Sequence, residues 1–227
     1  MKDAGVDVVI FCAMGNEAAA ARGVQTKPFR QVTCGGGRAS LGSLGDLRCL
    51  TVAAGLGERR LARCFRAAAE KFRPGVVINF GAAGGVRPEL EIGALTVPRE
   101  ILSYSWPDLK VSGDVIRPSV GFLEDLQEEI VLTRAGACRR FVHDDGARSR
   151  LFAELEIDTT DWETYRVASL CREHDISFAA LRCVTDHAGS VADLEYGAHS
   201  DRVLASGARL LGPLAERALR SLSVLDR

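Results

Sequence analysis

The chain has 227 residues, 47% of them hydrophobic and 26% charged, which is enough to bury a full core between layers of helix and sheet, so we expect one domain over residues 1–227. Its 29 basic and 30 acidic residues leave a net charge of −1, which removes any electrostatic reason to expect nucleic acid or an anionic membrane as a partner. Seven cysteines with no CxxC pair argue against a zinc site or a disulfide framework and favour a reducing, cytoplasmic setting.

The first half of the chain alternates apolar runs with helical patterns. The run at residues 6–13 predicts a buried strand rather than a signal peptide, because Asp3 and Asp7 spoil the positive leader that a signal peptide needs. In chain order we predict a strand over 6–13, a helix over 16–22, a strand over 47–54, a tight turn over 55–57, a helix over 58–71 and a strand over 76–80 that leads into the glycine cluster Gly81–Gly85.

The second half repeats this alternation with less regular spacing. We predict an extended segment over 95–103, a loop over 104–118, helices over 122–129 and 164–174, a strand over 178–185 and an amphipathic helix over 201–222 that bends near Gly212-Pro213. No apolar run reaches the roughly 18 residues that a membrane span requires. Strands alternating with helices are typical of an α/β protein with a largely parallel sheet, so we expect a three-layer α/β/α fold.

Acidic residues and glycine clusters stand at the ends of the predicted elements. Glu17, Gly55–Gly57 and Gly81–Gly85 each follow a strand, and ligands of such sheets bind at the carboxyl ends of the strands, so we expect these clusters at one edge. A glycine cluster serves either a tight turn or the close approach of a ligand to the backbone, and both interpretations stay open. Glu163 and Asp186 are caps or surface charges, or they form an acid–base set with Glu17.

The common cofactor and metal motifs are missing from the sequence. Neither glycine cluster has the GxGxxG spacing of dinucleotide-binding proteins, and no GK[ST] of a phosphate-binding loop occurs. No His pair has metal-ligand spacing and no Ser-His-Asp set is visible. We therefore expect no cofactor and no metal.

Four segments together resemble the nucleosidase and nucleoside phosphorylase superfamily, and most of all its hydrolytic methylthioadenosine/adenosylhomocysteine branch. They occur in family order, between residues 8 and 188. Residues 13–17 resemble an A-M-x-x-E opening, residues 79–93 resemble the glycine signature, residues 161–163 resemble an E-M-E motif and residues 178–186 resemble an R-x-x-S-D motif. The chain departs from the family at Ala94, where an Asp is usual, and at Trp162, where Met is frequent.

The resemblance implies a central mixed, partly barrel-like sheet and the cleavage of a purine nucleoside at its N-glycosidic bond. It assigns Asp186 as the acid that protonates purine N7, Glu17 as the base or orienter of the attacking water, and Glu163 as the partner of the ribose 2′- and 3′-hydroxyls. Thr185 would position Asp186, and Arg182 would hydrogen-bond in this region. Asp186 must then hold a proton near neutral pH, which burial could supply.

The remaining site candidates would shape the pocket around the nucleoside. Trp162 lies in the sugar or 5′ pocket or is a core aromatic, and Phe141 stacks on the base or packs in the core. Leu56, in the turn of residues 55–57, would line the pocket. The resemblance adds Ala82, Ala83 and Gly84 of the glycine signature as substrate-binding residues.

The sequence leaves alternatives open for the nucleophile and for the 5′ substituent. Phosphorylases of the superfamily place an Arg and a Ser where this chain has Asn79 and Ala82, which favours water, although Arg22, Arg38 or Arg59 could approach from elsewhere. The alternatives are a phosphorylase, a nucleosidase for adenosylhopane or futalosine, and a non-catalytic nucleoside-binding protein. The resemblance also implies a homodimer.

Overall fold

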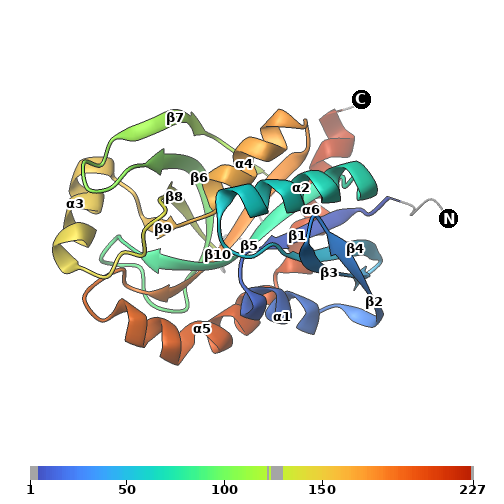
Figure 1. Ribbon diagram of the computed structural model, residues 1–227, viewed down its shortest axis with the longest axis horizontal. Coiled ribbons are helices and arrows are strands. Elements are labelled where there is room, and N and C mark those ends of the chain that lie inside the picture. The colour runs from blue at the N-terminus through green and yellow to red at the C-terminus, as the bar shows by residue number, and fades with distance from the viewer. Residues whose placement is uncertain (1–4, 122, 124–129, 226–227) are drawn as a thin grey trace.

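The computed structural model describes residues 5–121, 123 and 130–225, and Figure 1 shows its helices and strands. The first half of this part holds β1 (Val8–Cys12), α1 (Gly15–Gly23), β2 (Thr26–Cys34), β3 (Gly37–Leu44), β4 (Leu47–Ala53), α2 (Glu58–Phe72) and β5 (Val76–Gly85). The second half holds β6 (Leu95–Tyr104), β7 (Val111–Ile116), β8 (Val131–Ala137), α3 (Asp145–Leu155), β9 (Thr159–Asp161), α4 (Thr164–Glu173), β10 (Ser177–Asp186), α5 (Ala192–Ala208) and α6 (Leu211–Leu225).

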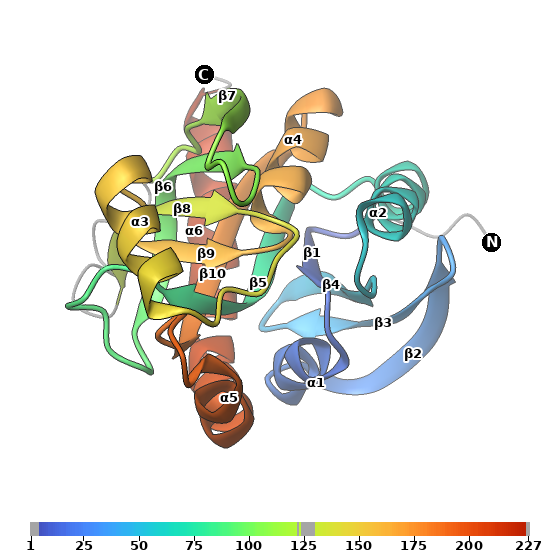
Figure 2. The ribbon, with the colours of Figure 1, turned by 60° about the vertical axis from the view of Figure 1, so that its left-hand side comes forward.

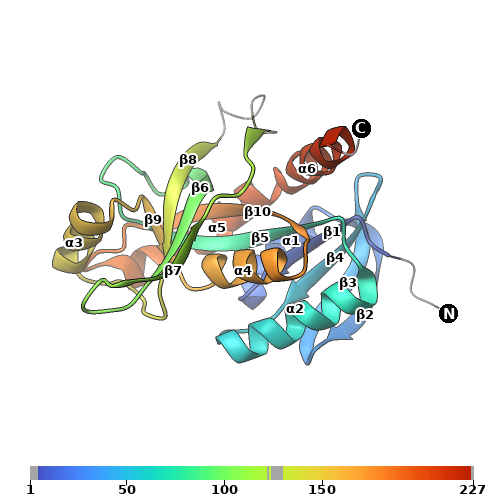
Figure 3. The ribbon, with the colours of Figure 1, turned by 90° about the horizontal axis from the view of Figure 1, so that it is seen from above.

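One mixed sheet runs through the molecule, and half of it closes on itself. The strand order is β10-β6-β8-β9-β5-β1-β4-β3-β2, with β7 on β6, and β10 also pairs with β5. The strands β5, β9, β8, β6 and β10 therefore form a closed ring, whereas β1, β4, β3 and β2 continue from β5 as an open sheet. The two halves lie at opposite ends of the molecule in Figure 3. This arrangement confirms the expected mixed, partly barrel-like sheet.

Strand β1 shows why helices cover both faces of the sheet. All five of its residues are buried, and they alternate between two hydrophobic clusters. Val8, Ile10 and Cys12 pack in a cluster with residues of α1, α5 and α6, whereas Val9 and Phe11 pack in a cluster with residues of α2 and α4. Successive side chains of a strand point to opposite faces, so an uninterrupted apolar run requires cover on both sides. Figure 2 shows α2 and α4 above the sheet and α1 and α5 below it, which confirms the three-layer fold.

The glycine cluster differs from its predicted place. Gly81–Gly85 do not follow the third strand but form the second half of β5, which pairs there with β10 and β9. A strand that continues through glycine is weakened unless something needs the missing side chains. Two buried carboxyl groups, those of Glu17 and Asp186, approach Gly81 and Gly84 closely and supply that reason.

Other differences concern the segments with weak or exposed patterns. The predicted loop 104–118 contains β7, an edge strand whose first four residues are exposed. The strands β2, β3, β8 and β9 and the helix α3 were not predicted. The helix predicted over 201–222 is two helices, α5 and α6, separated at residues 209–210; Pro213 stands in the first turn of α6, where its missing N–H is harmless. The helix predicted over 122–129 falls outside the described residues except at 123.

Among the described residues, no helix is both long and apolar enough to cross a bilayer.

Candidate active site

The acidic residues come together from the carboxyl ends of β1 and β10, which flank β5, and from the connection between β9 and α4. β5 pairs in parallel with β1 on one side and with β10 on the other. Glu17 follows β1 in the first turn of α1, Asp186 is the last residue of β10, and Glu163 immediately precedes α4. All three acids line one cavity of about 380 Å³. The candidates Leu56, Ala82, Ala83, Gly84, Phe141, Trp162 and Thr185 also line this cavity, whereas Arg182 does not.

Asp186 lines the cavity, and among the described residues no Lys, Arg or His lies within ion-pair distance of its carboxyl group. Its side chain accepts hydrogen bonds from the Thr185 hydroxyl at 2.9 Å and from the Ala188 backbone N–H at 3.0 Å. The residue is only 2% exposed, and this burial raises the pKa of Asp186 even though the two hydrogen bonds lower it. Desolvation disfavours the charged form of a carboxyl group, so the geometry favours a protonated Asp186.

Glu17 is held by backbone groups rather than by side chains. One carboxylate oxygen accepts from the N–H groups of Ala13 at 3.0 Å and Met14 at 2.8 Å, and the other accepts from the N–H of Ala82 at 3.0 Å. Three donors from two elements leave the side chain one orientation. Glu17 is thereby fixed between the start of α1 and the second half of β5.

The close approach of both acids to β5 explains its glycines. A Cβ at Gly81 would collide with the Glu17 carboxylate, and a Cβ at Gly84 would lie 2.9 Å from Asp186 Oδ1. That separation is shorter than the contacts that Cβ atoms make. The glycines are therefore required by the protein's own carboxyl groups and not by a turn.

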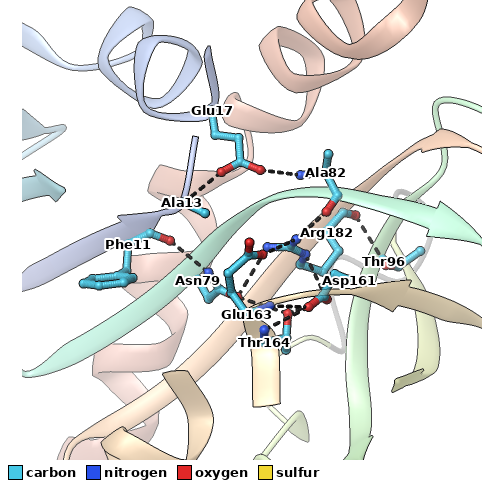
Figure 4. Close-up of polar contacts among 10 residues, drawn as sticks. All are labelled: Phe11, Ala13, Glu17, Asn79, Ala82, Thr96, Asp161, Glu163, Thr164 and Arg182. Atoms are coloured by element: carbon cyan, nitrogen blue, oxygen red, sulfur yellow. Dashed lines mark hydrogen bonds and ion pairs between the residues drawn. The ribbon is translucent and has the colours of Figure 1, made fainter. Parts of the chain in front are cut away.

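Arg182 lies at the centre of a buried charge cluster (Figure 4). Its guanidinium lies 3.3 Å from Asp161 Oδ2 and 3.5 Å from Glu163 Oε2. It also donates to Asn79 Oδ1 at 3.3 Å and to the carbonyl oxygen of Ala82. A fully buried cation needs several such partners, and here the hydrogen bonds are made by the two terminal nitrogens, whereas Nε makes none. Arg182 thus contacts the residues around the cavity and does not itself line it.

Asp161 is the partner of Arg182 that sequence reasoning missed. Its carboxylate accepts from the backbone N–H groups of Glu163 and Thr164, both at 2.9 Å, and from the Thr164 hydroxyl at 2.6 Å. It therefore fixes the start of α4 and the backbone of Glu163 at the same time. An Asp three residues before a Thr, at the start of a predicted helix, is the capping pattern that would have identified it.

Glu163 is the acid of this cluster that faces the cavity most openly. Its side chain remains 11% exposed. Burial, together with the negative charges of Glu17 and Asp161, raises the pKa of Glu163 to about 8, against the opposing effect of Arg182. Glu17, Asp161 and Glu163 would carry three negative charges against the single positive charge of Arg182. The cluster therefore favours the binding of one extra proton by a carboxyl group.

The mouth of the cavity is partly apolar. Trp162 is 37% exposed and Leu56 is 46% exposed, so neither is a core residue, and Phe141 lines the same cavity. Asp193 and Tyr196 of α5 complete the lining near Asp186. The sequence pattern did not indicate these two residues, because it predicted a helix from residue 201, whereas α5 begins at Ala192.

Few free cations face the cavity. Arg22, Arg38 and Arg59 do not line it, and Asn79 is fully buried and donates to the carbonyl of Phe11 at 2.9 Å. Among the described residues, the only arginine that lines the cavity is Arg140. A phosphate ion normally needs several charged or N–H donors, so the arrangement favours water as nucleophile.

The mixed sheet is half barrel and half open, and buried acids gather at one cavity. These features define a class of α/β protein, and comparison with known protein families identifies which one. The family model of the phosphorylase superfamily matches residues 7–220, and this chain belongs to that superfamily.

The chain is also similar to individual proteins that carry the names of nucleosidases and of a futalosine hydrolase. The chain is 25% identical to the 5′-methylthioadenosine/S-adenosylhomocysteine nucleosidase of Mycobacterium bovis, over 91% of this chain and 95% of the relative. Its fold is similar to that of the Helicobacter pylori enzyme of the same name, with a TM-score of 0.85, 18% identity and coverage of 93% and 99% of the two chains. It is also similar to Helicobacter pylori futalosine hydrolase, with a TM-score of 0.82, 16% identity and coverage of 94% and 98%.

Proposed function

We propose that this chain is a purine nucleosidase, which hydrolyses the N-glycosidic bond of an adenosine-type nucleoside and releases adenine. The observation that carries the proposal is that Asp186, a buried carboxyl group with a raised pKa, shares one cavity with Glu17 and Glu163. Membership of the phosphorylase superfamily and the similarity to methylthioadenosine/adenosylhomocysteine nucleosidases support it.

The first step is departure of the base. Asp186 transfers its proton to purine N7 while the C1′–N9 bond breaks and its electron pair goes to the base. Protonation makes the purine a better leaving group, and the ribose is left as an oxocarbenium-like cation. Thr185 holds one oxygen of Asp186 at 2.9 Å, and the Ala188 N–H holds the other at 3.0 Å.

The second step is attack by water. Water adds to C1′ and gives its proton to Glu17, whose orientation is fixed by three backbone N–H donors. Glu163 accepts hydrogen bonds from the ribose 2′- and 3′-hydroxyls, which places C1′ between the two acids. Trp162, Leu56 and Phe141 cover the nucleoside, and Phe141 stacks on the base.

The decisive experiment measures adenine release with and without phosphate. We expect turnover in phosphate-free buffer and no ribose 1-phosphate when phosphate is present. Adenosine, methylthioadenosine, adenosylhomocysteine, inosine and futalosine form the substrate panel. A strict phosphate requirement would identify a phosphorylase instead, and nucleoside binding without release of any base would identify a non-catalytic binding protein.

The proposal includes three further expectations, on the number of domains, the oligomeric state and the cellular setting. We expect one domain over residues 1–227, which a single cooperative thermal transition would support, and a homodimer, which light scattering would detect. All seven cysteines are buried free thiols, which supports a reducing, cytoplasmic setting. Fractionation of the cell of origin would test this setting.

A further inference from the structure

Strand β10 ends in a turn with an unfavourable backbone conformation. Asp186 is the last residue of β10, and residues 187–191 connect it to α5. Ala188 has a φ of 50°, in the left-handed region that residues other than Gly, Asn and Asp rarely adopt. Such a conformation persists only where surrounding contacts hold it. The turn at residues 186–188, called the Ala188 turn below, therefore needs partners outside itself.

Glu195, in the first turn of α5, is such a partner. Its Oε2 accepts a hydrogen bond from the backbone N–H of His187 at 2.9 Å, and its Oε1 lies 2.8 Å from Nδ1 of the His187 ring. Both side chains are partly buried. One carboxylate thus fixes the backbone and the side chain of the same residue and ties both to a helix.

The Ala188 turn carries a donor to the proposed acid. The Ala188 N–H donates to Asp186 Oδ1 at 3.0 Å, and the turn packs against β5, where a Cβ at Gly84 would lie 3.0 Å from the Ala188 Cβ. Burial raises the pKa of Asp186, whereas this hydrogen bond lowers it. The bond favours the ionised carboxyl group, so it stabilises the carboxylate that remains when Asp186 gives up its proton.

We propose that Glu195 is a positioning residue of the reaction, which holds His187 so that the Ala188 N–H stays directed at Asp186. This inference rests on the proposed function, in which Asp186 protonates the base. Glu195 does not line the cavity, so it acts through residues 187 and 188 and not on the substrate. Its loss should therefore lower kcat and leave KM nearly unchanged.

The charge of Glu195 also acts on Asp186 and must be separated from its position. Burial raises the pKa of Glu195, but its contacts with His187 outweigh burial and lower it, so Glu195 is ionised at neutral pH. This negative charge adds to the effect of burial in raising the pKa of Asp186, and His187 opposes it. The other ionisable residues that line the cavity with Asp186 are Glu17, Arg140, Asp161, Glu163, Asp193 and Tyr196.

Two conservative variants separate position from charge. Glu195→Gln keeps the reach of the side chain, with an oxygen that accepts from the His187 N–H and an amide that can donate to the ring. Glu195→Asp keeps the charge but is one methylene too short to make both contacts. We expect kcat on the low-pH side of its falling limb to drop roughly tenfold in Glu195→Asp and to stay within about threefold in Glu195→Gln.

The profile of kcat against pH supplies a second readout. Glu195→Gln removes a negative charge that raises the pKa of Asp186, so the falling limb should move to lower pH. KM should stay within about threefold of the wild-type value in both variants. Glu216→Asp is the matched control, because Glu216 is exposed on α6, pairs with Arg220 and does not line the cavity. It should change neither kcat nor the profile.

Any result in which Glu195→Asp is not the slower of the two variants would overturn the proposal. Hydrogen exchange of the Ala188 amide gives a readout that does not depend on turnover, and it should be roughly tenfold faster in Glu195→Asp than in the wild type and Glu195→Gln. If the wild type releases no base, the nucleosidase proposal fails by itself, and amide exchange then decides whether Glu195 holds the Ala188 turn. Equal exchange rates in the two variants would show that it does not.

Discussion

The two ends of the cavity bury carboxyl groups in different surroundings. At the proposed base end, Asp186 is 2% exposed and pairs with no guanidinium among the described residues, so burial raises its pKa. At the proposed sugar end, Asp161 and Glu163 are buried around Arg182, which lowers the pKa of Glu163. Burial and the negative charges of Glu17 and Asp161 outweigh that effect and raise the pKa of Glu163 to about 8. A guanidinium beside a buried acid therefore does not by itself keep that acid ionised at neutral pH.

The largest expected effect comes from removing the proton at the base end. Asp186→Asn keeps the size and one donor but cannot supply an acidic proton, so we expect kcat to fall by roughly 10²–10⁴-fold while nucleoside binding persists. Adenine release and calorimetric binding measure the two quantities. Wild-type kcat should fall as the pH rises through the raised pKa of Asp186, because only the protonated form donates. Retained turnover in the variant would remove Asp186 from the mechanism.

Removing the cation at the sugar end should act on stability. Arg182→Met leaves Asp161 and Glu163 buried without their partner, so we expect the free energy of unfolding to fall by about 3–5 kcal/mol. Chemical denaturation measures the change. Arg150→Met is the matched control, since Arg150 pairs with Glu154 on the surface and its loss should leave the midpoint unchanged. Equal effects of the two substitutions would contradict the buried-cluster account.

Glu163→Gln should weaken the recognition of the ribose. We expect kcat/KM to fall by roughly 10- to 100-fold, since each hydrogen bond to a carboxylate is stronger than one to an amide. Because hydroxyls donate to the ionised form and the pKa of Glu163 is raised to about 8, wild-type KM should decrease as the pH rises through 8. The variant should lack this step. A 2′,3′-dideoxy substrate should not distinguish wild type from variant.

The smallest expected effect concerns the hydroxyl that tunes the donor. The Thr185 hydroxyl donates to Asp186 Oδ2 and lowers the pKa of Asp186. Thr185→Val should raise that pKa and move the falling limb of the profile of kcat against pH to higher pH. Because more Asp186 is then protonated, we expect kcat at neutral pH to rise about three- to tenfold. Thr185→Ser keeps the hydroxyl and should leave the profile in place. A displaced limb in the Ser variant would show that packing, and not the hydrogen bond, sets the pKa.

Sequence reasoning succeeded where a local pattern carries the information. The apolar runs of β1, β4 and β10 and the helical spacing of α2 predicted those elements to within a few residues. The strands β2 and β3 were not predicted, because their apolar pattern is weak and their pairing depends on partners elsewhere in the chain. The edge strand β7 was not predicted, because most of its residues are exposed and it has no apolar pattern of a buried strand.

The candidate site shows the same limit. The resemblance to a family supplied Glu17, Glu163 and Asp186, which the fold brings to one cavity. It did not supply Asp193 or Tyr196, because no local signal marks the true start of α5. Nor could the sequence show that Arg182 is buried outside the cavity lining among Asp161, Asn79 and Ala82, since this depends on the pairing of β10 with β5.

Strand β5 has a consequence for how such a protein can diversify. This strand belongs to both the closed ring and the open sheet. Its Gly81 lies against the carboxylate of Glu17, and its Gly84 lies against that of Asp186. A bulkier residue at either glycine would displace Glu17 or Asp186, so few substitutions on this strand are compatible with the proposed reaction. Trp162, Leu56 and Phe141 lie outside it, on connecting segments that can be exchanged one at a time. Selection for a new 5′ group can therefore proceed by changes at the rim while the reaction itself is inherited intact.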